Sequence, residues 1–316
     1  MIWDSENYEW GIKNKNKEIT MKAGFIGLGI MGNHMANNLL NAGCELFVND
    51  VNEEAVKRVV SWGGKAATYE EIGKECSVVL ISVPTGAITK SILFEYGLAD
   101  ALSEGSVVCD LSSCTPVESR ECYDGLKAKN IGFLDAPVSG GEPGAIAGTL
   151  AIMVGGEESD FEKMKPYFDI IGSSAVYVGK SGSGSTTKLA NQIIVNNNIA
   201  VVAEALVFAT KMGVDPAKVY EAIRGGLAGS AVLDAKAPMM IEHNFKPGGP
   251  IYINWKDIKN VTDTARSQDI TVPYSAQLFE IMKYLKLHGH INDDHSVIAR
   301  YFEELCGVEI GDIENE

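Results

Sequence analysis

Short apolar runs rich in β-branched residues alternate with helix-periodic stretches from Met21 to about residue 184. Short unbroken apolar runs predict strands, and apolar residues spaced three and four apart predict helices. We expect strands near 22–27, 45–49, 77–83, 106–111, 131–135, 149–154 and 175–178, with helices near 30–42, 53–62, 86–94, 116–129 and 158–168. Strands that alternate with helices are typical of a parallel sheet covered by helices, so this part of the chain is predicted to be α/β.

After Gly184 the pattern becomes helical throughout. An apolar-periodic stretch runs from 185 to 213 without a helix breaker and ends at Gly213. Further helices are expected near 216–224, 231–242, 255–268, 274–288 and 293–305. We therefore predict an α/β domain at 21–184 and an all-α domain at 185–316, joined by one long interdomain helix.

Residues 1–20 differ from both domains because they are polar, rich in lysine and asparagine, and contain only isolated aromatic residues. Such a composition favours a flexible N-terminal extension, with a short docking arm as the alternative.

The chain has 316 residues, of which 46% are hydrophobic, and it can therefore bury a sizeable core. Its formal net charge of −15 argues against a nucleic-acid or anionic-membrane surface, because clusters of Lys and Arg bind phosphates. No run approaches the roughly 18 consecutive apolar residues of a membrane-spanning helix, and the N-terminus lacks a signal-peptide pattern. We expect a cytoplasmic protein whose partner is a small molecule.

The segment GLGIMG at 27–32 follows an apolar strand and opens a helix, which is the context that a dinucleotide-binding G-x-G-x-x-G loop requires. The first glycine permits a tight turn, the second lets the backbone approach a pyrophosphate, and the third lets helix and strand pack closely. A plain tight turn is the alternative. The motif predicts a Rossmann-type dinucleotide-binding domain whose cofactor contacts are Gly27, Leu28, Gly29, Ile30, Met31 and Gly32.

Asp50 stands 18 residues after Gly32, at the end of the second expected strand. A carboxylate there accepts hydrogen bonds from the adenosine ribose hydroxyls and repels a 2′-phosphate. Val51 and Asn52 supply no cation. The sequence therefore favours NAD(H) over NADP(H), unless Asp50 is only a turn residue or a helix cap.

Three further segments carry candidate chemistry. DAPVSGG at 135–141 ends a strand, where Ser139, Gly140 and Gly141 could seat a carboxylate. Lys188 lies one turn into the long helix, with Asn191 and Gln192 on the same face, and a helix N-terminus lowers the pKa of a lysine. Lys256 is expected to begin a helix beside Asp257, and an exposed ion pair is the alternative for it.

Histidine and cysteine offer no competing chemistry. The six cysteines have no C-x-x-C spacing and no paired histidines nearby, which predicts buried reduced thiols and no metal site. No histidine lies in the glycine-rich segments. His34 is expected on the first helix. The other histidines are expected at the surface, namely His243, His288, His290 and His295. A lysine is therefore the candidate general acid/base.

These motifs, in this order, resemble the β-hydroxyacid dehydrogenase family, which includes 6-phosphogluconate and 3-hydroxyisobutyrate dehydrogenases. The likeness covers Met21 to about Val308. It implies that Lys188, in G-x-G-x-x-x-K-x-x-N, is catalytic with Asn191, and that Lys256 lies beside nicotinamide and substrate. It further implies substrate contacts at Ser139, Gly140, Gly141 and Gln192, cofactor contacts at Val83, Pro84 and Ser113, and a homo-oligomer.

Within the family, KLANQ and AIRGGLAGSAVLDAKAPMM resemble the reductases that convert tartronate semialdehyde (2-hydroxy-3-oxopropionate) to glycerate. The chain departs from them after KPG, where it reads GGPIYINWKDI and they usually carry FRI followed by Asp, Leu and His. This leaves 3-hydroxyisobutyrate or another 3-hydroxy acid, including a longer dicarboxylate, as an alternative substrate. A dinucleotide-binding module without catalysis is the alternative of another class.

Overall fold

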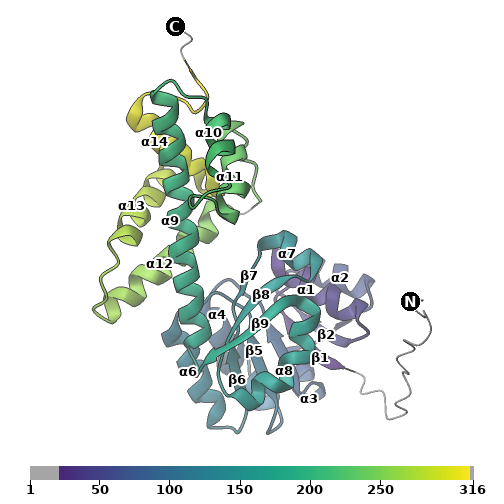
Figure 1. The fold of residues 1–316 in the computed structure, drawn as a ribbon. Coiled ribbons are helices and arrows are strands. Elements are labelled where there is room, and N and C mark those ends of the chain that lie inside the picture. Colours follow the sequence, from purple (N-terminus) through teal and green to yellow (C-terminus); the bar gives the residue numbers. More distant parts are fainter. Residues whose placement is uncertain (1–20, 249, 314–316) are drawn as a thin grey trace, which may run out of the picture.

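The computed structural model describes residues 21–248 and 250–313. The extension expected at residues 1–20 lies outside the described residues. The described chain has an α/β half and an all-helical half, which confirms the predicted fold class, and the two halves meet along one long helix (Figure 1).

Six parallel strands form the main part of one sheet in the order β3-β2-β1-β4-β5-β6. This order is that of dinucleotide-binding domains, and their ligands lie at the carboxyl ends of the strands. Strand β8 pairs antiparallel with β6 and β7 and parallel with β9. The strands are β1 (Lys22–Ile26), β2 (Glu45–Asn49), β3 (Lys65–Ala66), β4 (Val78–Ile81), β5 (Val107–Asp110), β6 (Gly132–Asp135), β7 (Val138–Ser139), β8 (Leu150–Gly155) and β9 (Gly172–Gly179).

Helices cover both faces of this sheet, because successive side chains of a strand point to opposite faces and both sets are apolar. On β1, Phe25 packs into the core on one face and Ile26 into the core on the other. The helices of this half are α1 (Ile30–Asn41), α2 (Glu53–Ser61), α3 (Tyr69–Glu75), α4 (Gly86–Lys90), the π-helix η1 (Ser91–Glu95), α5 (Leu98–Ala101), α6 (Pro116–Lys127), α7 (Gly141–Ala147) and α8 (Glu158–Ile171).

The long helix α9 (Ser183–Lys211) leaves the sheet and runs into the helical half (Figure 1). Its buried apolar residues join a separate core there, together with residues of the later helices. Among the described residues, α9 alone is long and apolar enough to cross a membrane, but half of its most apolar window is buried inside the fold. The remaining helices are α10 (Pro216–Ile223), α11 (Ala231–Ile241), α12 (Ile251–Ser267), α13 (Pro273–Leu287), the 3₁₀ turns η2 (His290–Asn292) and η3 (His295–Ile298), and α14 (Ala299–Cys306).

Several short elements were not expected from the sequence, namely β3, α3, α5, β7 and α7. Each is too short to show a periodic pattern, and α3 is recognisable instead by its capping box at Thr68 and Glu71. Helix α12 begins at Ile251 behind Pro250, whose fixed φ suits a helix start, so the prediction that Lys256 begins a helix was wrong.

The prediction of a continuous helix at 293–305 was also wrong. Asp294 instead caps the 3₁₀ turn η3, and α14 begins only at Ala299. This turn carries His295 into the interior, where it is 1% exposed, which corrects the prediction of a surface histidine. Burial lowers the pKa of His295 to about 3, so the ring is neutral at physiological pH.

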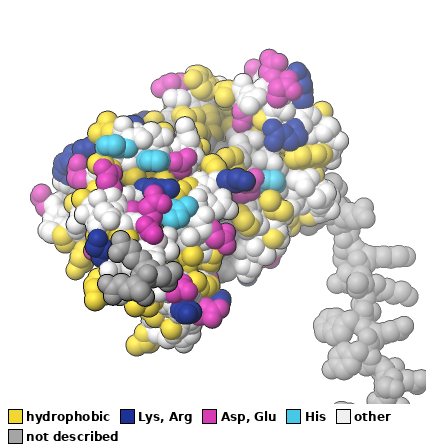
Figure 2. All heavy atoms as spheres, turned by 90° about the horizontal axis from the view of Figure 1, so that it is seen from above, with side chains coloured by type: hydrophobic (Ala, Val, Ile, Leu, Met, Phe, Trp, Pro, Cys, Tyr) yellow, Lys and Arg dark blue, Asp and Glu magenta, His cyan; other side chains and the backbone are white. Residues whose placement is uncertain are grey.

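The surface agrees with the acidic composition. On the face that Figure 2 draws, lysine and arginine side chains lie scattered among acidic ones and form no single basic patch. Five cysteines are buried and Cys306 is exposed, and all six are free thiols. No group of histidine, cysteine and acidic residues within the described chain could hold a metal ion.

Candidate active site

The glycine loop between β1 and α1 has one glycine in a left-handed conformation and one packed against backbone. Gly27 has φ +93°, and a Cβ there would lie 2.1 Å from the carbonyl oxygen of Ser82. A Cβ on Gly32 would lie 1.9 Å from the carbonyl oxygen of Gly27. These two glycines are therefore required by the fold of the loop itself.

Gly29 is required by neither strain nor packing. Its φ is −68°, and a Cβ built there meets nothing within 4 Å. No side chain caps α1, so the N–H groups of its first turn point into this open space. The loop therefore fits a dinucleotide, because a pyrophosphate needs free N–H groups and room for close approach of the backbone.

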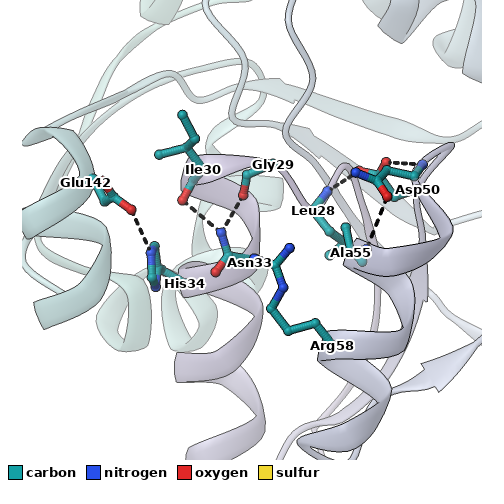
Figure 3. Close-up of a pocket in the computed structure, with 10 residues that line it drawn as sticks. Leu28, Gly29, Ile30, Asn33, His34, Asp50, Ala55, Arg58 and Glu142 are labelled. Atoms are coloured by element: carbon teal, nitrogen blue, oxygen red, sulfur yellow. Dashed lines mark hydrogen bonds and ion pairs between the residues drawn. The ribbon is translucent and has the colours of Figure 1, made fainter. Parts of the chain in front are cut away.

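Asp50 lies directly after β2 and is tied to the glycine loop. One carboxylate oxygen accepts a hydrogen bond from the Leu28 N–H at 2.5 Å, and the other accepts from the Asn52 N–H at 2.7 Å. Beside it a pocket of about 400 Å³ opens between α1 and α2, as the close-up in Figure 3 shows. Glu142 of α7 and His34 of α1 form its far wall, with Nε2 of the histidine 3.2 Å from the carboxylate.

The DAPVSGG segment makes a turn that only glycines adopt readily. Gly140 has φ +141° and Gly141 has φ +63°, and α7 begins at the second of these glycines. Asp135, at the start of the segment, accepts hydrogen bonds of 2.8 Å from the N–H groups of Gly182 and Ser185. Burial raises the pKa of Asp135 to about 6, against the lowering effect of these bonds. The first turn of α9 is thus attached to the end of β6.

This attachment places Lys188 behind the Ser139 turn. The Lys188 side chain is buried, and its Nζ donates a hydrogen bond of 2.8 Å to the carbonyl oxygen of Val138. Burial and the nearby Lys256 lower the pKa of Lys188, while Asp257 opposes them. The sequence predicts this lowered pKa from the helix N-terminus, whereas its largest cause in the structure is burial.

Asp257 is a member of this site that the sequence did not single out. It is 2% exposed, and its Oδ1 accepts a hydrogen bond of 2.9 Å from Oγ of Ser113. Its Oδ2 accepts a hydrogen bond from Nε2 of Gln192, whose Oε1 in turn accepts from Asn191 at 3.1 Å. The adjacent K-D pair was the available signal, but a carboxylate next to a lysine is more often an exposed ion pair.

Lys256 reaches back from α12 to the loops that follow β4 and β5. Its Nζ donates to the carbonyl oxygens of Pro84 at 3.3 Å and Ser113 at 3.2 Å, and lies 3.1 Å from Oδ1 of Asp257. The Val83 N–H donates to Oγ of Ser112, which holds the β4 loop to the β5 loop. The carboxyl ends of β4 and β5 therefore face Lys256 and Asp257.

The predicted site residues fall into two groups along the carboxyl edge of the sheet. The first is the glycine loop with Asp50 and the pocket beside it. The second brings together predicted residues from both halves with the unpredicted Asp257, namely Val83, Pro84, Ser113, Lys188, Asn191, Gln192 and Lys256. Ser139 follows Val138, the partner of Lys188, so its turn adjoins this second group. A long molecule bound at the first group could present its far end to two lysines at the second.

Comparison with known proteins finds relatives for both halves of the chain. Residues 22–179 match the NAD binding domain of 6-phosphogluconate dehydrogenase, and residues 182–302 match the NAD-binding domain of NADP-dependent 3-hydroxyisobutyrate dehydrogenase. The chain is 38% identical to 2-hydroxy-3-oxopropionate reductase of Escherichia coli K12, over 90% of this chain and 97% of that protein. It is 32% identical to 2-(hydroxymethyl)glutarate dehydrogenase of Eubacterium barkeri, over 93% of this chain and 98% of that protein.

A solved structure has the same fold. The 3-hydroxyisobutyrate dehydrogenase of Mycobacterium tuberculosis, solved with L-serine, is 26% identical and superposes with a TM-score of 0.84. The match covers 90% of this chain and 99% of that chain.

Proposed function

The chain belongs to the β-hydroxyacid dehydrogenase family, as its sequence motifs indicated, and we propose that it reduces tartronate semialdehyde to glycerate with NADH. Family membership makes it an NAD(P)-dependent oxidoreductase of small hydroxy acids. The observation that carries the proposal is the buried Lys188, which lies against the Ser139 turn and opposite Lys256 and Asp257.

In the proposed reaction, Ser139 and the N–H groups of Gly140 and Gly141 bind the substrate carboxylate. NADH, which the glycine loop and Asp50 would hold, would supply a hydride to the aldehyde carbon. Lys188 donates the proton of its ammonium group to the aldehyde oxygen, so the carbonyl becomes an alcohol and the lysine is left neutral until it takes a proton from water. A lowered pKa favours this proton donation, because a general acid works best when its pKa lies near the working pH.

The surrounding polar residues are proposed to orient these groups. Asn191 is assigned to orient the substrate or Lys188, and Gln192 to contact the substrate. The Gln192 amide is already held by Asp257 and Asn191, so any substrate contact would extend this hydrogen-bond chain. Lys256 is assigned to the nicotinamide end of the cofactor, because it reaches the loops after β4 and β5.

For the cofactor, we propose a preference for NAD(H). Asp50 accepts two backbone hydrogen bonds, yet a carboxylate has about four acceptor positions, so it can also accept from ribose hydroxyls. Its negative charge disfavours a 2′-phosphate.

A longer dicarboxylic semialdehyde is the second candidate substrate. The N-terminal part of α12, which precedes Lys256, lacks the arginine and histidine usual in tartronate semialdehyde reductases. Asn254 in this segment donates a hydrogen bond of 2.7 Å to the buried Asn196 of α9 instead. A relative at 32% identity is named for a longer dicarboxylate, 2-(hydroxymethyl)glutarate, which supports keeping this candidate.

We also propose that the enzyme is a cytoplasmic homo-oligomer, with a dinucleotide-binding domain at 21–184 and a helical domain at 185–316. The separate apolar cores of the two halves support the domain assignment. Helix α9 exposes Ile194, Val201 and Phe208, seven residues apart, and a second copy could cover them. Light scattering during size-exclusion chromatography would measure the oligomeric state.

The test of the proposed function is NADH oxidation with purified enzyme and a panel of small aldehyde acids. Tartronate semialdehyde should give the highest kcat/KM, with glycerate as the product. Absence of NADH oxidation with every aldehyde acid would support the dinucleotide-binding module instead.

A further inference from the structure

The pocket beside Asp50 contains a cation that the sequence analysis did not find. Arg58 belongs to the last turn of α2, and Figure 3 shows its side chain reaching from that helix toward Asn33 on α1. Among the described residues that line the pocket, Arg58 is the only lysine or arginine. Val51 and Asn52, which follow Asp50 in sequence, carry no positive charge, whereas Arg58 lies eight positions beyond Asp50.

The guanidinium of Arg58 is available to a ligand. Within the described chain it makes no ion pair, whereas Lys57 beside it pairs with Glu54 at 2.8 Å and His34 pairs with Glu142. Asp50 does not hold it, because that carboxylate is turned to the N–H groups of Leu28 and Asn52. A guanidinium is charged at all pH values relevant here, and its planar set of donors matches the oxygens of a phosphate.

The position of the pocket indicates which phosphate this would be. Gly29 and Asp50 both line it, and these residues flank the ribose of an adenosine bound in such a loop. The first turn of α1 serves the pyrophosphate. The 2′-oxygen of the ribose, which carries the additional phosphate of NADP(H), would then lie near the pocket that Arg58 lines.

The other usual anion site nearby is blocked. The N-terminus of α2 could attract a phosphate through its free N–H groups, but the Asn52 side chain already accepts from the N–H groups of Glu54 and Ala55. Glu53 and Glu54 also place negative charge in this turn. A 2′-phosphate entering the pocket would therefore depend on Arg58 for its positive partner.

We propose that Arg58 binds the 2′-phosphate of NADP(H), so that the enzyme accepts both cofactors and its preference is set by Asp50 against Arg58. The proposal rests on the proposed function only for the placement of the dinucleotide. The site that discriminates between the cofactors would then be one carboxylate after β2 and one guanidinium on α2, and not Asp50 alone.

Calorimetric titration of the full-length protein tests this without turnover. The probes are AMP, which has only the 5′-phosphate, and adenosine 2′,5′-bisphosphate, which adds the 2′-phosphate. In Arg58→Gln, the affinity for the bisphosphate should fall by about tenfold more than the affinity for AMP, as expected for a partly exposed charge-assisted hydrogen bond. The difference between the losses of affinity for the two probes should become smaller in high salt, because the contact is near the surface.

Lys57→Gln is the matched control, since it removes the same charge from the same helix one residue away. It should leave the ratio of the two affinities at the wild-type value. Equal losses of affinity for both probes in Arg58→Gln would place the guanidinium on adenine or the 5′-phosphate and overturn the proposal. Unchanged affinity for both probes would overturn it as well. Failure of the wild-type protein to bind NADH or either probe would overturn the dinucleotide site itself, and the proposed function with it.

Discussion

Asp257 joins the two halves of the molecule through Ser113, whose hydroxyl donates a hydrogen bond of 2.9 Å to it across 144 positions of sequence. The other oxygen of Asp257 accepts from Gln192 of α9. This one buried carboxylate therefore binds a loop of the sheet and the long helix together, close to Lys188.

Replacing Asp257 should change the titration of Lys188. Burial and Lys256 lower the pKa of Lys188 and Asp257 raises it, so Asp257→Asn should lower that pKa further. Reduction needs the protonated lysine and declines as pH rises through its pKa. The alkaline limb of the pH profile of kcat/KM should therefore move to lower pH. The control is Asp263→Asn on the exposed side of the same helix, and an identical limb in both variants would contradict the assignment.

Removal of the proposed general acid should affect chemistry more than binding. Lys188→Ala should lower kcat by about 10²–10⁴-fold, or roughly 3–5 kcal/mol of transition-state stabilisation. NADH affinity, measured by fluorescence titration, should stay close to wild type. Lys211→Ala, at the opposite end of the same helix, is the control. A normal kcat in Lys188→Ala would exclude this lysine from proton transfer.

Two glycines of the cofactor loop should respond differently to the same substitution. Gly32→Ala places a Cβ against a backbone carbonyl, so it should lower the free energy of unfolding by about 1–3 kcal/mol, measured as a fall in Tm. Gly29→Ala meets nothing in the protein, so Tm should not fall, but NADH binding should weaken by about tenfold, or about 1.4 kcal/mol. Equal NADH affinity of Gly29→Ala and wild type would show that the pyrophosphate lies elsewhere.

The charge of Asp50 should control cofactor preference. Wild-type enzyme should have a higher kcat/KM with NADH than with NADPH, and Asp50→Asn should narrow this gap because repulsion of the 2′-phosphate is relieved. The asparagine retains an oxygen that can accept from the Leu28 N–H. Equal kcat/KM for the two cofactors in the unmodified enzyme would refute the preference.

The substrate prediction depends most on resemblance. Tartronate semialdehyde should be reduced with higher kcat/KM than methylmalonate semialdehyde or succinate semialdehyde. A site built to bind a substrate hydroxyl rejects analogues that lack it, provided that its polar partners are present. If either of the other aldehydes has a kcat/KM more than tenfold higher, the chain is not a tartronate semialdehyde reductase. The proposals of hydride transfer and of proton donation by Lys188 would still stand.

The sequence predicted those parts of the molecule that depend on local pattern. The strand and helix around Gly27 and Gly32 followed from periodicity and from a loop that only glycine can form. Lys188 was identified from its motif, but the cause of its lowered pKa was not, because burial by a distant strand and by α12 has no local signal.

Residues brought in from far along the chain were missed for the same reason. Arg58 lines the pocket beside Asp50 only because α2 lies beside α1, and Asp257 links the two halves only because α12 packs against α9. His295 was missed in the opposite direction, because it was predicted at the surface but lies in a 3₁₀ turn whose four residues are all buried.

Helix α9 is attached at its N-terminal end to the carboxyl end of β6. It has 29 residues and is therefore about 44 Å long, and Asp135 accepts hydrogen bonds from two N–H groups at its N-terminal end. Lys188 lies about one turn from this attachment and also donates to the carbonyl oxygen of Val138. Any bending of the helix farther along would therefore leave Lys188 beside the Ser139 turn.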